Sequence, residues 1–171
     1  MVNLAPDEKS TLVMVYTMNM LVRGEVITKE SARVAVWPRT QSVPNLIHMI
    51  KVNVLLFGGS PPHSSSCDEI YVPTSTMIGF HLAPPQADVL DYDPKELNRS
   101  MEPVSMIMGT FLVKGHIRMA TTASLATSLE VAFNGWLSIY DAEISNAFLP
   151  QKQPLKVQLM LVSPNRINFL V

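Results

Sequence analysis

One short stretch, residues 63–69, gathers side chains that can bind a transition metal. His63, Cys67 and Asp68 offer an imidazole, a thiolate and a carboxylate, which are ligand types that zinc accepts. A zinc site needs further ligands at a recognisable spacing, and Cys67 is the single cysteine of the chain. We therefore interpret the stretch as a polar loop with an incidental cysteine, expect no cofactor, and keep a metal-dependent enzyme as a third hypothesis.

A second group of residues has the types that bind bases or aromatic ligands. Arg33 and Arg39 flank Trp37, and an indole beside guanidinium groups can stack on a flat ligand. Against nucleic acid stands the charge balance, with 13 basic and 14 acidic residues and a net charge of −1. A barrel that binds a small ligand or single-stranded nucleic acid is the alternative hypothesis, with nucleic acid disfavoured as a partner.

Other catalytic patterns are weak. No serine lies in the glycine-flanked pattern of a nucleophile elbow, although serine, histidine and aspartate all occur. Asp141 and Glu143 are two residues apart and would share one face of a strand, which is also what a solvated strand shows. We expect no enzymatic activity.

The elements that position these residues read as two copies of one β-rich unit. Leu21 to Val26 and Leu112 to Ile117 share an apolar pair, a cation, a glycine, a polar residue and a β-branched residue. Glycine inside a strand typically marks a bulge or bend, so Gly24 and Gly115 are candidate structural bends. The pattern predicts an all-β fold with one or two short helices, arranged as two tandem, pseudo-symmetric small barrel-like or sandwich-like units.

The expected organisation has four parts. Residues 1–10 form an N-terminal arm, 11–82 the first unit, 83–103 an acidic proline-rich linker, and 104–171 the second unit. Each unit is expected to open with one long strand bent at its glycine. Ala123 to Ala132 has helical spacing, with Thr122 as its N-cap.

Composition favours an interaction protein. Hydrophobic residues make up 47% of the chain and charged residues 16%, below the usual quarter, and there are 11 methionines. The leading hypothesis is thus a non-catalytic assembly module whose partner is itself, as a homo-oligomer, or another protein. The N-terminus lacks the pattern of a signal peptide, and the most apolar run, residues 46–57, is too short and too polar to span a membrane as a helix. A cytoplasmic location is expected.

Overall fold

The computed structural model describes residues 4–170, and the chain is mostly β with short helices, as expected. The strands are β1 (Glu8–Tyr16), β2 (Met20–Lys29), β3 (Leu46–Leu56), β4 (His63–Pro73), β5 (Gly79–Leu82), β6 (Arg99–Met108), β7 (Phe111–Ala120), β8 (Leu137–Asn146), β9 (Leu155–Val162) and β10 (Asn168–Leu170). The helical segments are η1 (Val34–Arg39), η2 (Thr74–Thr76), η3 (Pro164–Arg166) and α1 (Leu125–Ala132), of which the first three are 3₁₀-helices.

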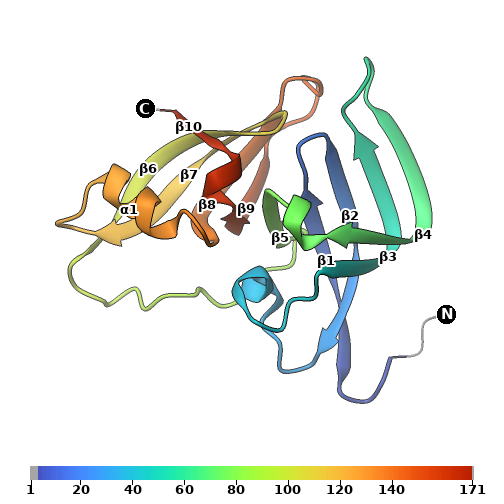
Figure 1. The fold of residues 1–171 in the computed structure, drawn as a ribbon, viewed down its shortest axis with the longest axis horizontal. Coiled ribbons are helices and arrows are strands. Elements are labelled where there is room, and N and C mark those ends of the chain that lie inside the picture. The colour runs from blue at the N-terminus through green and yellow to red at the C-terminus, as the bar shows by residue number, and fades with distance from the viewer. Residues whose placement is uncertain (1–3, 171) are drawn as a thin grey trace.

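All ten strands belong to one antiparallel sheet. Its strand order is β10-β6-β7-β8-β9-β5-β1-β2-β3-β4, so β10 and β4 are the outer strands and the sheet is not closed within residues 4–170. The first five strands and the last five form two curled halves that lie side by side (Figure 1). Each half has its strands in the same relative order, and the pair β5–β9 connects the halves.

The long bent strand expected at the start of each unit is instead a hairpin. β1 and β2 turn at Thr17–Asn19, where the Thr17 amide donates to the Met20 carbonyl at 2.9 Å. β6 and β7 turn at Gly109, whose φ of 59° lies in the left-handed region that glycine adopts without strain. The expectation was wrong because both hairpin arms are apolar, which hides the turn between them in the sequence pattern.

Gly24 and Gly115 lie where the strand register shifts. The β2–β3 pairing changes register between Arg23 and Glu25, and the β7–β8 pairing between Lys114 and His116. A Cβ atom at Gly115 would lie 2.9 Å from the Tyr140 carbonyl oxygen and 2.6 Å from Ile139 Cγ2. The backbone of the neighbouring strand therefore approaches too closely for a side chain here.

Several boundaries differ from expectation. β1 begins at Glu8, inside the expected arm over residues 1–10, of which residues 1–3 lie outside the described part, as does Val171. β4 begins at His63, so the stretch read as a polar loop is an edge strand. β6 begins at Arg99, inside the expected linker, because residues 99–103 pair with β7.

The expected short helix is present, but its N-cap is Ser124 rather than Thr122. The Ser124 hydroxyl accepts a hydrogen bond from the Thr127 amide at 3.2 Å. In the first half, η1 occupies the same place between the second and third strands and contains Pro38.

The apolar side chains form two core clusters, one mostly from each half. Tyr16, Phe57 and Ile78 of the first half belong to the cluster of the second, and Leu161 of the second belongs to the cluster of the first. The two halves therefore share packing across the β5–β9 pair. Among the described residues, no helix is long and apolar enough to cross a membrane.

Candidate functional site

The junction between the halves is a short antiparallel pair of β5 with β9. Gly79 lies opposite Val162 and Phe80 opposite Leu161, and the Ser163 amide donates to the Ile78 carbonyl at 3.0 Å. All six residues are buried. The apolar burial of this short pair makes the junction part of the core rather than a hinge.

Gly79 allows the layers at the junction to pack closely. A Cβ atom there would lie 2.5 Å from Met108 Sδ and 2.6 Å from Met160 Cε, and both methionines are fully buried. The glycine thus leaves room for two methionine side chains of the second half. Methionine suits such a site because its flexible side chain fills irregular gaps.

The two outer strands carry apolar side chains that lack this cover. On β4, Tyr71 is 58% exposed and stacks on His48 with ring centroids 4.6 Å apart. On β10, Phe169 is half-buried and Leu170 is 45% exposed. An outer strand with apolar side chains presents unpaired backbone groups and is a ready site for pairing with another chain.

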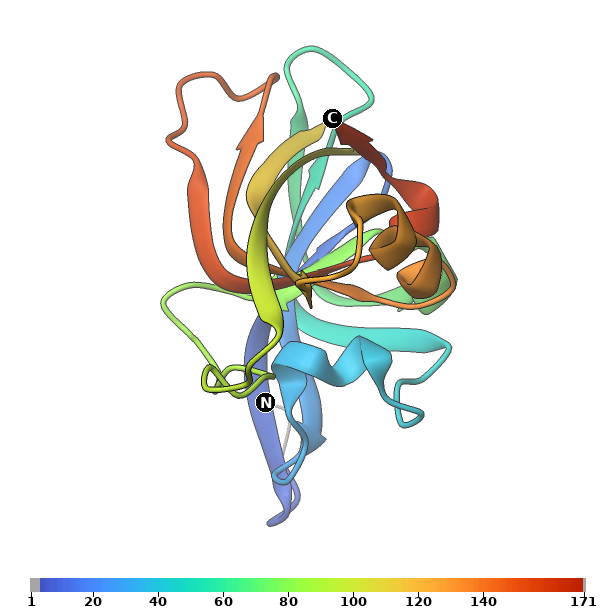
Figure 2. The ribbon, with the colours of Figure 1, turned by 90° about the vertical axis from the view of Figure 1, so that its left-hand side faces the viewer.

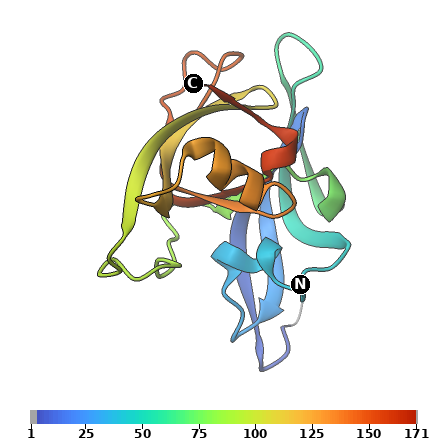
Figure 3. The ribbon, with the colours of Figure 1, turned by 60° about the vertical axis from the view of Figure 1, so that its left-hand side comes forward.

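The helical segments of the two halves differ in burial. η1 contacts β5 and β9 and buries Val34, Ala35, Trp37 and Pro38. α1 buries no residue, and Val131 and the following Phe133 are 85% and 49% exposed. α1 lies beneath β10, near the free edge of the second half (Figure 3). η1 thus covers part of β9. In the second half, the described chain supplies no strand in the corresponding place beside α1.

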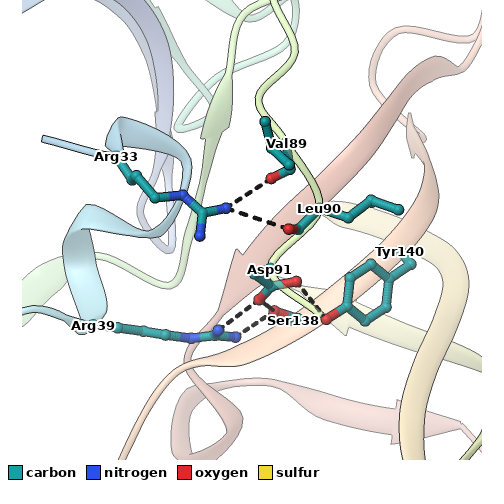
Figure 4. Close-up of polar contacts among 7 residues, drawn as sticks. All are labelled: Arg33, Arg39, Val89, Leu90, Asp91, Ser138 and Tyr140. Carbon is teal, nitrogen blue, oxygen red and sulfur yellow. Dashed lines mark hydrogen bonds and ion pairs between the residues drawn. The ribbon is translucent and has the colours of Figure 1, made fainter. Parts of the chain in front are cut away.

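A polar cluster fastens the linker to both halves (Figure 4). Asp91 accepts hydrogen bonds from Arg39 at 2.7 Å, Ser138 at 2.8 Å and Tyr140 at 2.6 Å. Arg39 also donates to the Ser138 hydroxyl. The Asp91 side chain is 8% exposed, so its charge is neutralised where water is scarce.

The environment of this cluster changes the pKa of two groups. Burial tends to raise the pKa of Asp91, but hydrogen bonds from Tyr140, Ser138 and Arg39, with the charge of Arg39, outweigh it and lower that pKa below its ordinary value. Burial, and then the hydrogen bond to Asp91, raises the pKa of Tyr140 to about 12. Asp91 is therefore an anion and Tyr140 a neutral donor at neutral pH, which is a structural arrangement rather than an acid–base pair poised near pH 7.

The linker is held along much of its length. Arg33 donates to the carbonyl oxygens of Val89 and Leu90, and Figure 2 shows the linker passing beside η1. Arg118 pairs with Glu96 at 2.5 Å and lies over the ring of Tyr92. The acidic segment between the halves is therefore held in place by hydrogen bonds and ion pairs.

The structure separates the three residues that sequence reasoning grouped around Trp37. Arg33 and Arg39 point to the linker and are engaged there, whereas Trp37 is buried and lines a groove of about 660 Å³ that neither arginine lines. The Thr28 hydroxyl, which is buried without a hydrogen-bond partner, belongs to the same groove. The guanidinium groups of Arg33 and Arg39 are thus not available to stack a base against the Trp37 indole.

The candidate metal ligands lie along β4. Strand geometry puts His63 and Cys67 about 13 Å apart and turns Asp68 to the opposite face. Among the described residues, no three histidine, cysteine or carboxylate side chains come close enough to hold a metal ion. Glu143 lies opposite Lys114 in the β7–β8 pair, while Asp141 has a φ of 47°.

Sequence reasoning missed the residues that connect the halves. Phe80 and Leu161 are 81 positions apart and Asp91 is 47 positions from Ser138, so no local pattern identifies them. One signal was present: Asp91 lies between Leu90 and Tyr92, whose large side chains can pack. Comparison of the chain with protein-family models, curated proteins and solved structures found no match.

Proposed function

We propose that the protein is a non-catalytic β-domain module that associates with copies of itself through the outer strands of its sheet. The observation that supports this is the exposure of apolar side chains on both outer strands, Tyr71 on β4 and Leu170 on β10. Association removes apolar surface from water, which stabilises by about 25 cal/mol per Å². It also gives the edge backbone groups hydrogen-bond partners.

The second part of the proposal is that the two halves are copies of one five-stranded unit. Val13 lies opposite Gly24 in the first hairpin, and Val104 lies opposite Gly115 in the second. Two non-glycine residues with positive φ, Lys51 at 51° and Asp141 at 47°, lie beside the two register shifts. A shared strand order with shared irregularities supports a duplication more strongly than strand alternation does.

The last strand paired to β3 and the last strand paired to β8 also correspond. Val72 lies opposite Ile47, and Val162 lies opposite Leu137. Val72 of β4 therefore has the position in the first half that Val162 of β9 has in the second. A cytoplasmic location is also part of the proposal, because the exposed thiol of Cys67 stays reduced there.

Light scattering over a concentration series tests self-association. The wild-type chain is expected to give a defined multiple of 19.0 kDa. Tyr71→Asp places a charge on the outer strand at an exposed position and is expected to lower the mass toward that of the monomer. Leu97→Asp is the matched control, because Leu97 is 82% exposed in the linker. A wild-type monomer at every concentration up to about 100 µM would refute the proposal.

The groove beside Trp37 favours a second candidate function, the binding of a small amphipathic ligand. Its lining joins Trp37, Leu46 and Ile50 with the unpartnered hydroxyl of Thr28. The test is saturable fluorescence enhancement of anilinonaphthalene sulfonate by the native chain, and its loss in Leu46→Arg, which fills the groove from an exposed position. Unsaturable, weak enhancement that Leu46→Arg leaves unchanged would remove this candidate.

A further inference from the structure

The pair β5–β9 shows how one half of this chain binds the other. It joins the outer edge of β5 to the outer edge of β9, with Phe80 opposite Leu161. The two edges are different strands, so the contact is heterologous: the surface given by one half is not the surface given by the other. Such a contact leaves one unused edge of each kind at the ends of the array.

The unused edges are the counterparts of the two joined strands. Phe169 of β10 lies opposite Met106 of β6, as Phe80 of β5 lies opposite Val15 of β1. Val72 of β4 occupies the place in its half that Val162 of β9 has in the other. The chain thus ends in a free strand of the β5 kind and a free strand of the β9 kind.

We propose that β10 of one copy pairs antiparallel with β4 of a second copy, head to tail, in the register of the β5–β9 pair. Phe169 then lies opposite Tyr71 of the next copy, and Asn168 opposite Val72 of that copy. This inference rests on the proposed self-association and specifies its partner and geometry. Because the contact is heterologous, repetition of it gives a closed ring or an open filament.

The backbone of β4 is oriented for this contact. The Thr74 amide donates to the Asn45 carbonyl at 2.9 Å, and Pro73 lies opposite Leu46. Since hydrogen-bonded and non-hydrogen-bonded positions alternate in an antiparallel pair, the Tyr71 amide points away from β3, toward the free side. Tyr71 can therefore form the bonds with Phe169 that Leu161 forms with Phe80.

The side chains considered on the free strands are more exposed than their counterparts on the joined strands, as expected where a neighbouring strand is missing. Leu161 and Phe80 are 0% exposed, whereas Tyr71 is 58% exposed and Phe169 is half-buried. The free positions keep large apolar or aromatic side chains, although an outer strand that must stay unpaired usually carries charge.

The helix α1 is placed to complete the contact. Its counterpart η1 covers β9 as well as β5 and buries four residues. α1 does not pack on β10 as η1 packs on β5, so the exposed apolar side chains of α1 remain free to pack on β4 of a second copy beside β10. This accounts for the exposed Val131 and Phe133.

One difference makes the contact between copies weaker than the contact within a copy. Ser163 donates its amide to the Ile78 carbonyl, whereas its counterpart on β4 is Pro73, which has no amide hydrogen. The contact between copies lacks that hydrogen bond. We therefore expect dilution to separate the copies while each sheet stays intact.

Two complementary variants test the head-to-tail geometry. Tyr71→Pro blocks the β4 edge and leaves the β3 pairing, because the lost amide points outward. Phe169→Pro blocks the β10 edge. Each variant alone is expected to be a 19.0 kDa monomer, and an equimolar mixture is expected to form a heterodimer with one copy of each and nothing larger. Ser65→Pro, toward the other end of β4, is the control that leaves assembly unchanged.

The outcomes separate this inference from the broader proposal. If Tyr71→Pro alone still dimerises through β10, or Phe169→Pro alone through β4, association is symmetric and the head-to-tail geometry is wrong while self-association stands. A monomeric wild-type chain overturns both. If circular dichroism shows that Phe169→Pro is unfolded, Val131→Arg replaces it, because Val131 is 85% exposed on α1, the helix proposed to pack on β4 of the second copy. A mixture that stays monomeric also overturns the geometry.

Discussion

Phe80 and Leu161 lie directly opposite each other across the β5–β9 pair, and neither side chain is exposed. Their contact joins the two halves of the sheet into one core. The residues in the corresponding places at the sheet ends, Phe169 and Tyr71, have no such partner within the described chain. The same type of strand edge is thus a core element in one place and surface in another.

Gly79→Ala is expected to destabilise the chain by about 1–3 kcal/mol, because the new methyl group overlaps Met108 and Met160. Urea unfolding measures this as a lower midpoint with an unchanged slope. Gly58→Ala is the matched control, since a Cβ atom there meets nothing within 4 Å. Equal midpoints for the two variants would show that the junction is not closely packed.

Asp91→Asn is expected to lower the free energy of unfolding by about 1–3 kcal/mol at pH 7, because Arg39 would then face a buried neutral amide in place of a carboxylate. The folded pKa of Asp91 is lowered, so its stabilisation is present above the ordinary carboxyl pKa of 3.8 and is lost as pH falls through the lower folded pKa. The difference in unfolding free energy between wild type and variant should shrink over that acidic range. Glu102→Gln, at an exposed position, is the control.

The burial of His81 predicts a second pH dependence of the folding stability, at milder acidity. Its Nδ1 donates to the Leu82 carbonyl, so Nε2 accepts a hydrogen bond from the Tyr16 hydroxyl at 2.9 Å. Burial lowers its pKa from 6.5 to about 4, although the bond to Leu82 opposes the shift. Stability is therefore full above pH 6.5 and decreases toward pH 4, by on the order of 3 kcal/mol.

The check is thermal or urea unfolding from pH 7.5 to pH 4. His81→Gln should lose the slope between pH 6.5 and pH 4, whatever its stability at neutral pH. His63→Gln, at an exposed position on β4, should keep it. A slope that persists in His81→Gln would assign the titration to another group.

Amide hydrogen exchange gives a prediction for the free edge. The Tyr71 amide points away from β3 and should exchange quickly in dilute solution, whereas the Val72 amide pairs with Ile47 and should be protected. At high protein concentration, protection should extend to Tyr71 and Phe169. Protection that does not depend on concentration would contradict pairing between copies.

Much of the β architecture follows from local pattern. Alternating apolar residues predict a strand over residues 155–162, and β9 has these bounds. The hairpin turn at Met18 was missed because a methionine in a turn carries no turn signal. The strand position of His63 and Cys67 was also missed, because the three serines between them are typical of a loop, yet they pair with β3 from Leu55 to Asn53.

The sequence alone determined that the chain is mostly β, that one short helix follows Thr122 and where a glycine interrupts a strand, because these depend on side-chain periodicity and on backbone freedom within a few residues. The tertiary structure decided which edges meet: β5 with β9, leaving β4 and β10 free. It also decided that Arg39 binds Asp91, 52 residues away, rather than a ligand beside Trp37. Backbone edges carry the same donors and acceptors in every strand, so only the packing of distant side chains selects the partner.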